Sequence, residues 1–186
     1  PSLIASFSSF YCHSVYITTK GEIRGIGYNK DGRIISSLPK KILNNYTEFE
    51  IKNKEGHLMT PLSAVCGKEY TLYLVTDKKN GNKAHLAYSY PNIKTDHPLF
   101  LNIGEVTPVS LFGGYCHSAA IDDNGSILFI PNSISNSPKT KIELVSLPDD
   151  EEAVNIACCE SFIVALSSTG KIYESGVKKG KLKFKE

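Results

Sequence analysis

Apolar and polar residues alternate in short runs along this 186-residue chain, and one such pattern recurs four times. Each copy has an alternating stretch, a tight polar turn with Asp, Asn or Gly, and a shorter apolar stretch that returns. Alternation over about four to eight residues, bounded by such turns, is typical of β-hairpins. Because no segment carries a 3.6-residue apolar pattern over three turns, the sequence predicts a nearly all-β chain.

The four copies align position by position, which predicts that they occupy equivalent places in one fold. Their first position holds only small residues, as close backbone packing requires: Ser9, Cys66, Gly113 and Cys158. Their fifth position, here called the ring position, holds flat rings: His13, Tyr70, His117 and Phe162.

Glycine closes the turn at the same offset from the ring position in three copies, at Gly21, Gly125 and Gly170. The second copy instead carries a small insertion, Lys78–Asn82, which a turn tolerates well. The returning strands are expected at 22–27, 84–89, 126–130 and 171–175. Outer strands are expected between the copies, at 3–7, 38–42, 49–52 and 142–148.

The repeat resembles the regulator of chromosome condensation repeat in its small-Gly-x-x-His-Ser opening, its Thr/Asp-x-Gly turn and its returning strand ending in Gly-x-Asn. The clearest copies run from Cys12-His13-Ser14 to Asn29 and from Gly113 to Ser126. The Trp-Gly pair of that family is missing, since the chain has no Trp, and Tyr70 and Phe162 replace the His. The fourth copy also lacks the Gly-Gly pair.

The resemblance implies an all-β fold of β-propeller blades, in a family that closes seven blades of about fifty residues each. Four copies would form a partial ring within one repeat domain spanning residues 1–186. The repeat cores are expected near 4–29, 62–89, 109–132 and 153–176. The chain is therefore expected to be part of a longer protein, unless the missing blades belong to another subunit or further repeats have diverged beyond recognition.

The cysteine content indicates the compartment in which the protein resides, whereas the charge indicates no class of binding partner. Lys and Arg total 21 against 19 Asp and Glu, a net charge of +2, which indicates neither nucleic acid nor a membrane surface. The apolar runs are far shorter than the roughly 20 residues that span a bilayer. Five cysteines without CxxC pairs favour a reducing compartment, so we expect an intracellular protein, cytoplasmic or nuclear.

The residues best suited to chemistry fall on repeat positions, which favours a structural role over a catalytic one. His13 and His117 could act as general bases, but Tyr70 and Phe162 share their position. A nucleophile pair of Cys12 with His13, or of Cys116 with His117, is disfavoured because successive strand residues point to opposite faces. We expect no catalytic residue. A cysteine- or histidine-dependent hydrolase is a third, disfavoured interpretation, kept for comparison.

Metal and cofactor sites are not indicated either. His57, His85 and His97 stand alone in polar segments, and a metal needs three or four convergent ligands. The basic stretch Gly176–Lys181 lacks the spacing and the Ser or Thr of a phosphate-binding loop. No metal and no cofactor are therefore expected.

Segments that differ between blades are the candidate partner-binding regions, because a rigid scaffold presents variable loops. They are the insertion with Lys78, Lys79 and Asn80 and the long segments 29–60 and 131–141. The lysine-rich stretch 178–185 could contact phosphates or an acidic protein, but an outer strand or a solvated tail is the favoured interpretation. The sequence predicts a non-enzymatic scaffold that binds a protein partner through blade loops. The alternative is guanine-nucleotide exchange on a Ran-like small GTPase, possibly on chromatin, which the resemblance implies.

Overall fold

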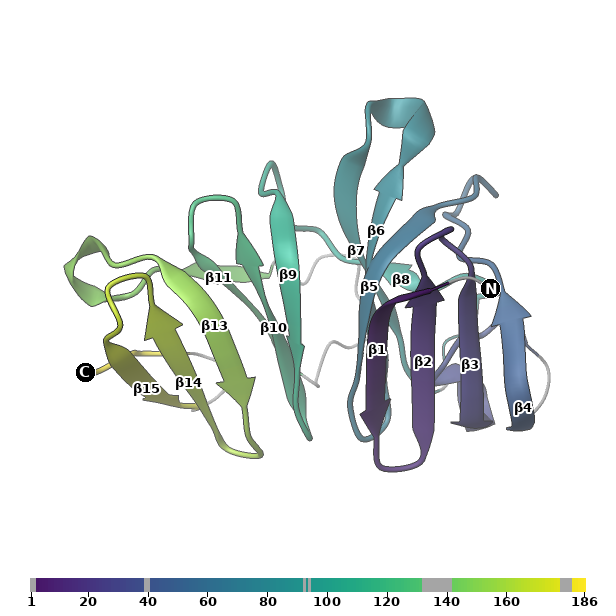
Figure 1. Ribbon diagram of the computed structural model, residues 1–186, viewed down its shortest axis with the longest axis horizontal. Helices are drawn as coiled ribbons and strands as arrows, with labels where there is room; N and C mark the ends of the chain where they lie inside the picture. Colours follow the sequence, from purple (N-terminus) through teal and green to yellow (C-terminus); the bar gives the residue numbers. More distant parts are fainter. Residues whose placement is uncertain (1–2, 39–40, 92, 94, 132–141, 178–181) are drawn as a thin grey trace. The chain divides into compact units, whose positions relative to one another are not determined.

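The four hairpin copies fold as four antiparallel sheets in a computed structural model (Figure 1). It describes residues 3–38, 41–91, 93, 95–131, 142–177 and 182–186. The first sheet has the order β1 (Ile4–Phe10), β2 (His13–Thr18), β3 (Ile23–Tyr28) and β4 (Ile42–Phe49). The second has the order β5 (Thr60–Cys66), β6 (Thr71–Asp77), β7 (Lys83–Ser89) and β8 (Leu99–Phe100).

The third and fourth copies build their sheets in the same way. The third sheet runs β9 (Pro108–Gly113), β10 (His117–Asp122), β11 (Ile127–Pro131) and β12 (Glu143–Val145). The fourth runs β13 (Ala153–Cys158), β14 (Phe162–Ser167) and β15 (Ile172–Gly176). Helical structure among the described residues is limited to the single 3₁₀ turns η1 (Lys30–Gly32), η2 (Lys78–Asn80) and η3 (Pro148–Asp150). The predicted all-β fold of β-propeller blades is confirmed.

Two expected outer strands are wrong. Neither expected segment, 38–42 nor 49–52, has the bounds of the outer strand of the first sheet, which is β4 and runs from Ile42 to Phe49. Residues 39–40 lie outside the described residues. Pairing with β3 selects this register, with Ile42 opposite Tyr28 and Phe49 opposite Ile23. The pair Asn44–Asn45 inside β4 has low strand propensity, so tertiary pairing overrides the local signal. The two-residue β8 is too short to leave an alternating pattern.

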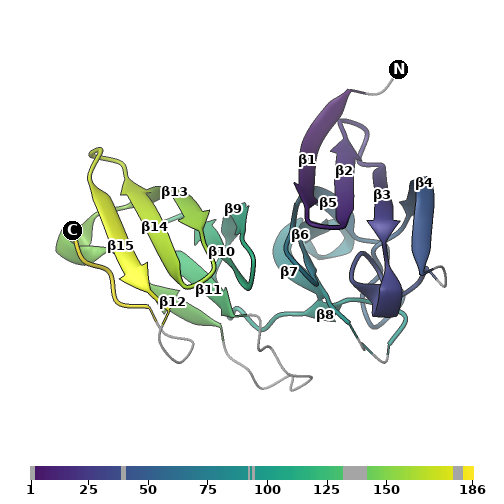
Figure 2. The same ribbon diagram turned by 90° about the horizontal axis from the view of Figure 1, so that it is seen from below.

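The chain divides into two compact units, Pro1–Leu101 and Asn102–Glu186, and each contains two sheets packed face to face. Figure 2 shows the sheets of each unit from a second direction. In the first unit β5 contacts both β1 and β2, and the apolar residues between the sheets form one buried cluster that includes Val15, Ile17 and Tyr73. This burial stabilises each sheet, because a lone sheet exposes its apolar face to water.

The second unit repeats this arrangement around its own core. Ala119, Ile121 and Phe129 of the third sheet share a buried cluster with Ile163 and Tyr173 of the fourth. The C-terminal Leu182 and Phe184 join this cluster, and Lys185 forms a bridge to Glu174 of β15. Residues 182–186 therefore lie along the outer edge of the fourth sheet, where one bridge pairs them with β15 without forming a further strand.

The two cysteines at the first repeat position, Cys66 and Cys158, lie where neighbouring sheets contact each other, whereas Ser9 is exposed. The thiol of Cys66 donates to the carbonyl of Ser8 at 3.5 Å, and the thiol of Cys158 donates to that of Phe112 at 3.9 Å. A Cβ added to Gly114 would lie 2.5 Å from the carbonyl oxygen of Cys158. The sheets are thus crowded at Cys66 and Cys158, where larger side chains would force them apart.

Candidate binding surfaces

Three of the four hairpin turns are closed by the same hydrogen bonds. Thr18, Asp122 and Ser167 all stand five residues after the ring position. Their side-chain oxygens accept backbone N–H groups across the turn, as Asp122 Oδ1 does from Asn124 and Ser126 at 3.0 and 2.7 Å. The glycine that follows has a φ between +72° and +88°, a region that favours glycine. The polar residue recurs visibly in the sequence, but its role was not predicted.

The turn of the second copy differs because of its insertion. Asp77 ends β6, and its carboxylate accepts the backbone N–H of Lys79 at 2.9 Å and the side-chain N–H of Asn80 at 2.6 Å. The N–H of Asn82 donates to the Asp77 carbonyl at 2.9 Å. The bond from Lys79 lowers the pKa of Asp77, which therefore remains charged. The insertion is thus a structured tip rather than a slack loop.

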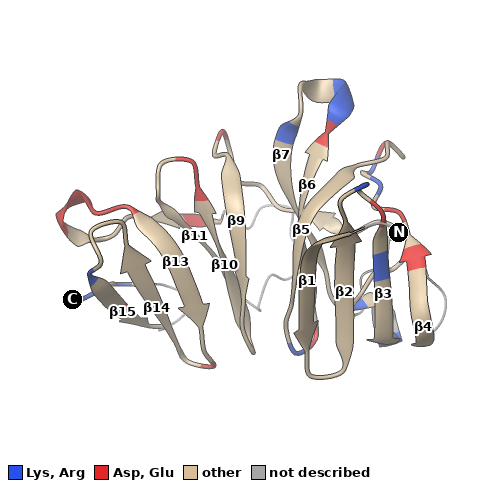
Figure 3. Cartoon of the chain, in the orientation of Figure 1, with Lys and Arg blue, Asp and Glu red and all other residues tan. Residues whose placement is uncertain are grey.

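This β6–β7 tip, residues 77–83, presents positive charge. Lys78, Lys79 and Asn80, which the sequence indicates as a partner-binding loop, are all exposed. Figure 3 shows basic residues at the end of this hairpin, beside the acidic residue that ends β6. Since Asp77 is buried beneath the turn, the exposed groups of the tip are mainly cationic. The tip is suited to contact an acidic surface.

The ring position links neighbouring sheets within a unit. His13 is 3% exposed, and its Nε2 lies 3.2 Å from the carbonyl oxygen of Tyr70 and 3.0 Å from Oγ1 of Thr71. Since that hydroxyl already donates to the Arg33 carbonyl at 2.8 Å, both groups accept from a protonated Nε2. Burial lowers the pKa of His13 to about 4, so the ring is neutral near pH 7. It joins the first sheet to the second.

The other three ring positions vary this arrangement. His117 is 2% exposed, and burial lowers its pKa while the backbone of Phe162 in the next sheet opposes that shift. Tyr70 is fully buried and stacks on Tyr88 with ring centroids 5.3 Å apart. Phe162, in contrast, is 43% exposed.

Cys12 lies closer to His13 than strand geometry predicts. It precedes β2 in a turn, where side chains need not alternate, and its Sγ lies 4.0 Å from Nδ1 of His13. The guanidinium of Arg33 donates to the same sulfur at 3.6 Å. However, Nε2 of His13 is hydrogen-bonded to Tyr70 and Thr71 of the second sheet, and these bonds hold the ring in place. The five cysteines, all within the described residues, are free thiols.

Metal-binding geometry is absent from the described part of the chain: no group of three His, Cys, Asp or Glu side chains converges there. His85 instead packs edge-to-face on Phe100 with ring centroids 6.1 Å apart, and burial lowers its pKa. The ring nitrogen Nδ1 of His97 lies 3.0 Å from the carbonyl of Pro98. These histidines serve local packing and turns.

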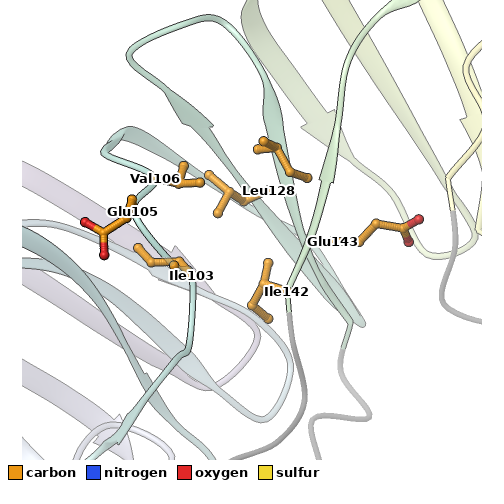
Figure 4. A pocket seen from close by; sticks show the side chains of 8 residues that line it. Ile103, Glu105, Val106, Leu128, Ile142 and Glu143 are labelled. Carbon is orange, nitrogen blue, oxygen red and sulfur yellow. The ribbon is translucent and has the colours of Figure 1, made fainter.

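A groove of about 610 Å³ lies in the second unit, and no sequence signal indicates it. It forms between the segment 103–106 and the strands β11 and β12, which are distant in sequence. Figure 4 shows the apolar side chains of Ile103, Val106 and Ile142 turned toward one another, with those of Glu105 and Glu143 directed away from them. The groove can accommodate an apolar side chain but brings no acid–base pair together.

Parts of the expected loops lie outside the described residues. These are residues 132–141, residues 39–40 of the segment 29–60, and the lysines between 178 and 181. Within the segment 29–60, Asn29 stabilises the turn that follows it. Its side-chain oxygen accepts the backbone N–H groups of Ile34 and Ile35 at 2.9 and 3.1 Å. No helix in the described residues is long and apolar enough to cross a membrane.

Comparison with known proteins supports the fold and assigns no family. No family model matches the chain, and no curated protein matches it. Among solved structures, Prp20p of Saccharomyces cerevisiae is similar, with a TM-score of 0.64 and 14% identity over 96% of this chain and 48% of that one. Human WBSCR16 is similar with a TM-score of 0.52 and 12% identity over 98% of this chain and 66% of that one. The chain thus spans less than two thirds of the length of either.

A designed protein, Ika4, is similar over 95% of this chain and 92% of its own, with a TM-score of 0.53 and 11% identity. At such low identities these likenesses show the fold alone. They place the four sheets among β-propeller blades and leave partner and activity open.

Proposed function

We propose that this chain is a non-enzymatic interaction module of the β-propeller type, which binds an acidic protein surface through the β6–β7 tip. The observation that carries the proposal is the tip itself. The Asp77 carboxylate accepts the backbone N–H of Lys79 and the side-chain N–H of Asn80, and the Asp77 carbonyl accepts the N–H of Asn82. Lys78, Lys79 and Asn80 nevertheless remain exposed. A preorganised loop loses little entropy on binding, so its charges contribute more to affinity than those of a slack loop.

Partner binding by similar folds supports the same function. Yeast RCC1 (Prp20), 13% identical to this chain with a TM-score of 0.64, has been crystallised bound to Kap60. YCF48, 11% identical with a TM-score of 0.54, has been crystallised bound to a D1 peptide. The absence of a converging acid–base pair around the described groove fits binding without a chemical step.

The test is a binding measurement with purified probes by biolayer interferometry, using Gsp1p and Kap60. We expect at least one probe to bind, with an affinity that falls as salt is raised. Reversing both charges, Lys78→Glu with Lys79→Glu, should weaken that binding about tenfold or more. The matched control Lys54→Glu reverses an exposed charge in another loop and should leave the affinity nearly unchanged. An affinity that is unchanged in the Lys78→Glu, Lys79→Glu variant would refute the role of the tip.

The second candidate function is nucleotide exchange on a Ran-like GTPase. It is favoured by the likeness to Prp20p, whose binding to Gsp1p and histones has been studied. An exchange factor acts by opening the nucleotide site and needs no catalytic side chain, so the described residues are compatible with it. Faster release of labelled nucleotide from Gsp1p would support this function. Unchanged release at micromolar concentrations of the chain would eliminate it.

A further inference from the structure

The outward face of the fourth sheet is apolar and exposed. Along β14, Ile163 and Ala165 are buried in the core of the second unit, while Phe162 and Leu166 are 43% and 38% exposed on the opposite side. Ile172 on β15 lies directly opposite Leu166 and is 63% exposed. With the half-buried Val164, these residues form what we call the fourth-sheet face: Phe162, Val164, Leu166 and Ile172.

The other three copies bury the equivalent face completely. Its residues stand at the ring position and two and four residues after it, and none is more than 4% exposed. In the first three copies they are His13, Val15 and Ile17; Tyr70, Leu72 and Leu74; and His117, Ala119 and Ile121. The fourth-sheet face is therefore a surface that this repeat is built to cover.

The first sheet has the complementary exposed side. Tyr16, three residues after the ring position, is half-buried, whereas its equivalents Tyr73, Ala120 and Ala165 are fully buried. Phe7 lies opposite Tyr16 on β1 and is 57% exposed, and Tyr46 on β4 packs edge-to-face on Tyr16 at 4.8 Å. These three aromatic residues, with Ser14, form the first-sheet face. Aromatic side chains of this kind are enriched in protein interfaces.

Packing inside the first unit shows how these two faces fit. Val15 and Ile17 of the first sheet share a buried cluster with Tyr73 of the second. Val164 and Leu166 stand at the repeat positions of Val15 and Ile17, and Tyr16 stands at that of Tyr73. The fourth-sheet and first-sheet faces therefore carry the residue types that already pack together within the molecule.

The polar positions match as well. Inside the first unit His13 donates to the Thr71 hydroxyl. At the equivalent places stand Phe162, which has no donor, and Ser14, whose hydroxyl already donates to Ser9 at 2.8 Å. At this pair of positions neither residue leaves a hydrogen-bonding group unsatisfied when the two faces meet, so burying Phe162 and Ser14 carries little desolvation cost.

We propose that the fourth-sheet face of one copy of this chain binds the first-sheet face of a second copy, head to tail. The contact joins two different surfaces and continues the sheet-on-sheet packing of the repeat across the two chains. It uses neither the β6–β7 tip nor a nucleotide-binding partner, so it stands independently of the proposed function.

The test measures the mass of the full chain by light scattering and sedimentation. We expect an assembly of two or more copies. Phe162→Glu and Tyr16→Glu should each raise its dissociation constant about thirtyfold or more, as loss of an interface anchor does. Mixing these two variants should restore association, because one intact fourth-sheet face and one intact first-sheet face remain. The control Leu58→Glu alters an exposed apolar residue outside both faces and should leave the mass unchanged.

Three results would overturn the proposal. The first is a monomeric wild type at about 100 µM, a concentration at which even a weak specific interface is populated. The second is an assembly that Phe162→Glu abolishes and Tyr16→Glu does not, which means that two fourth-sheet faces pair with each other. The third is failure of the mixed variants to associate. If either variant loses its thermal unfolding transition, Leu166→Lys and Phe7→Glu replace it in the same design.

Discussion

Histidine at the ring position illustrates how a reactive residue type becomes a structural one. His13 is buried with its Nε2–H bonded to the second sheet, and His117 occupies the same position in the third. Burial disfavours the charged imidazolium, which lowers the pKa of both residues. These rings hold sheets together and are poorly suited to exchange protons near neutral pH.

Stability should therefore depend on pH through His13. Its pKa of about 4 lies below the ordinary value of 6.5, so the unfolded chain binds the proton more tightly. The contribution of His13 to the free energy of unfolding, about 3 kcal/mol, is fully present above pH 6.5. This contribution is lost as the pH falls toward 4. Urea unfolding at pH 7, 5.5 and 4.5 measures the slope. His13→Phe should lower stability at pH 7 and flatten the slope, and the control His57→Phe should retain it; an unchanged slope in His13→Phe contradicts the assignment.

At the scale of the element, the hairpin turn is the repeated unit that the sequence exposes most clearly. Each turn begins at a residue whose side chain accepts backbone N–H groups: Thr18, Asp77, Asp122 and Ser167. Such bonds replace water around the tight turn and fix the register of the strands on both sides.

Removing one of these side chains should weaken its hairpin. Asp122 is 4% exposed and accepts two backbone N–H groups, so Asp122→Ala leaves both without partners. We expect a loss of about 2 kcal/mol in the free energy of unfolding, measured with urea. Asp123→Ala, next to it and exposed, should change stability by less than about 0.5 kcal/mol. Equal effects of the two substitutions would contradict the role of Asp122.

Much of the fold follows from the sequence because its signals are local. Alternation and turn residues locate the hairpins to within about one residue: the returning strand expected at 22–27 is β3, Ile23–Tyr28. Outer strands such as β4 are set by pairing with β3 across a long connection, and Asn44–Asn45 gives no local hint of it. The groove escapes sequence reasoning because Ile103, Leu128 and Ile142 meet only after folding.

At the scale of the whole molecule, a net charge of +2 conceals surfaces of opposite sign. In the first unit the β6–β7 tip is basic. In the second unit Asp123, Asp149, Asp150 and Glu152 are exposed on turns, which Figure 3 shows as acidic. A partner held by the basic tip should therefore be acidic, and its affinity should fall with salt.

Binding of a partner through the β6–β7 tip is what we propose for this propeller module. Hydrogen–deuterium exchange, with the chain free and saturated with the tightest-binding probe protein, tests it most directly. We expect slower exchange at residues 77–83 in the complex and none of this protection in the Lys78→Glu, Lys79→Glu variant. Protection confined to other residues, with 77–83 exchanging as in the free chain, would contradict it.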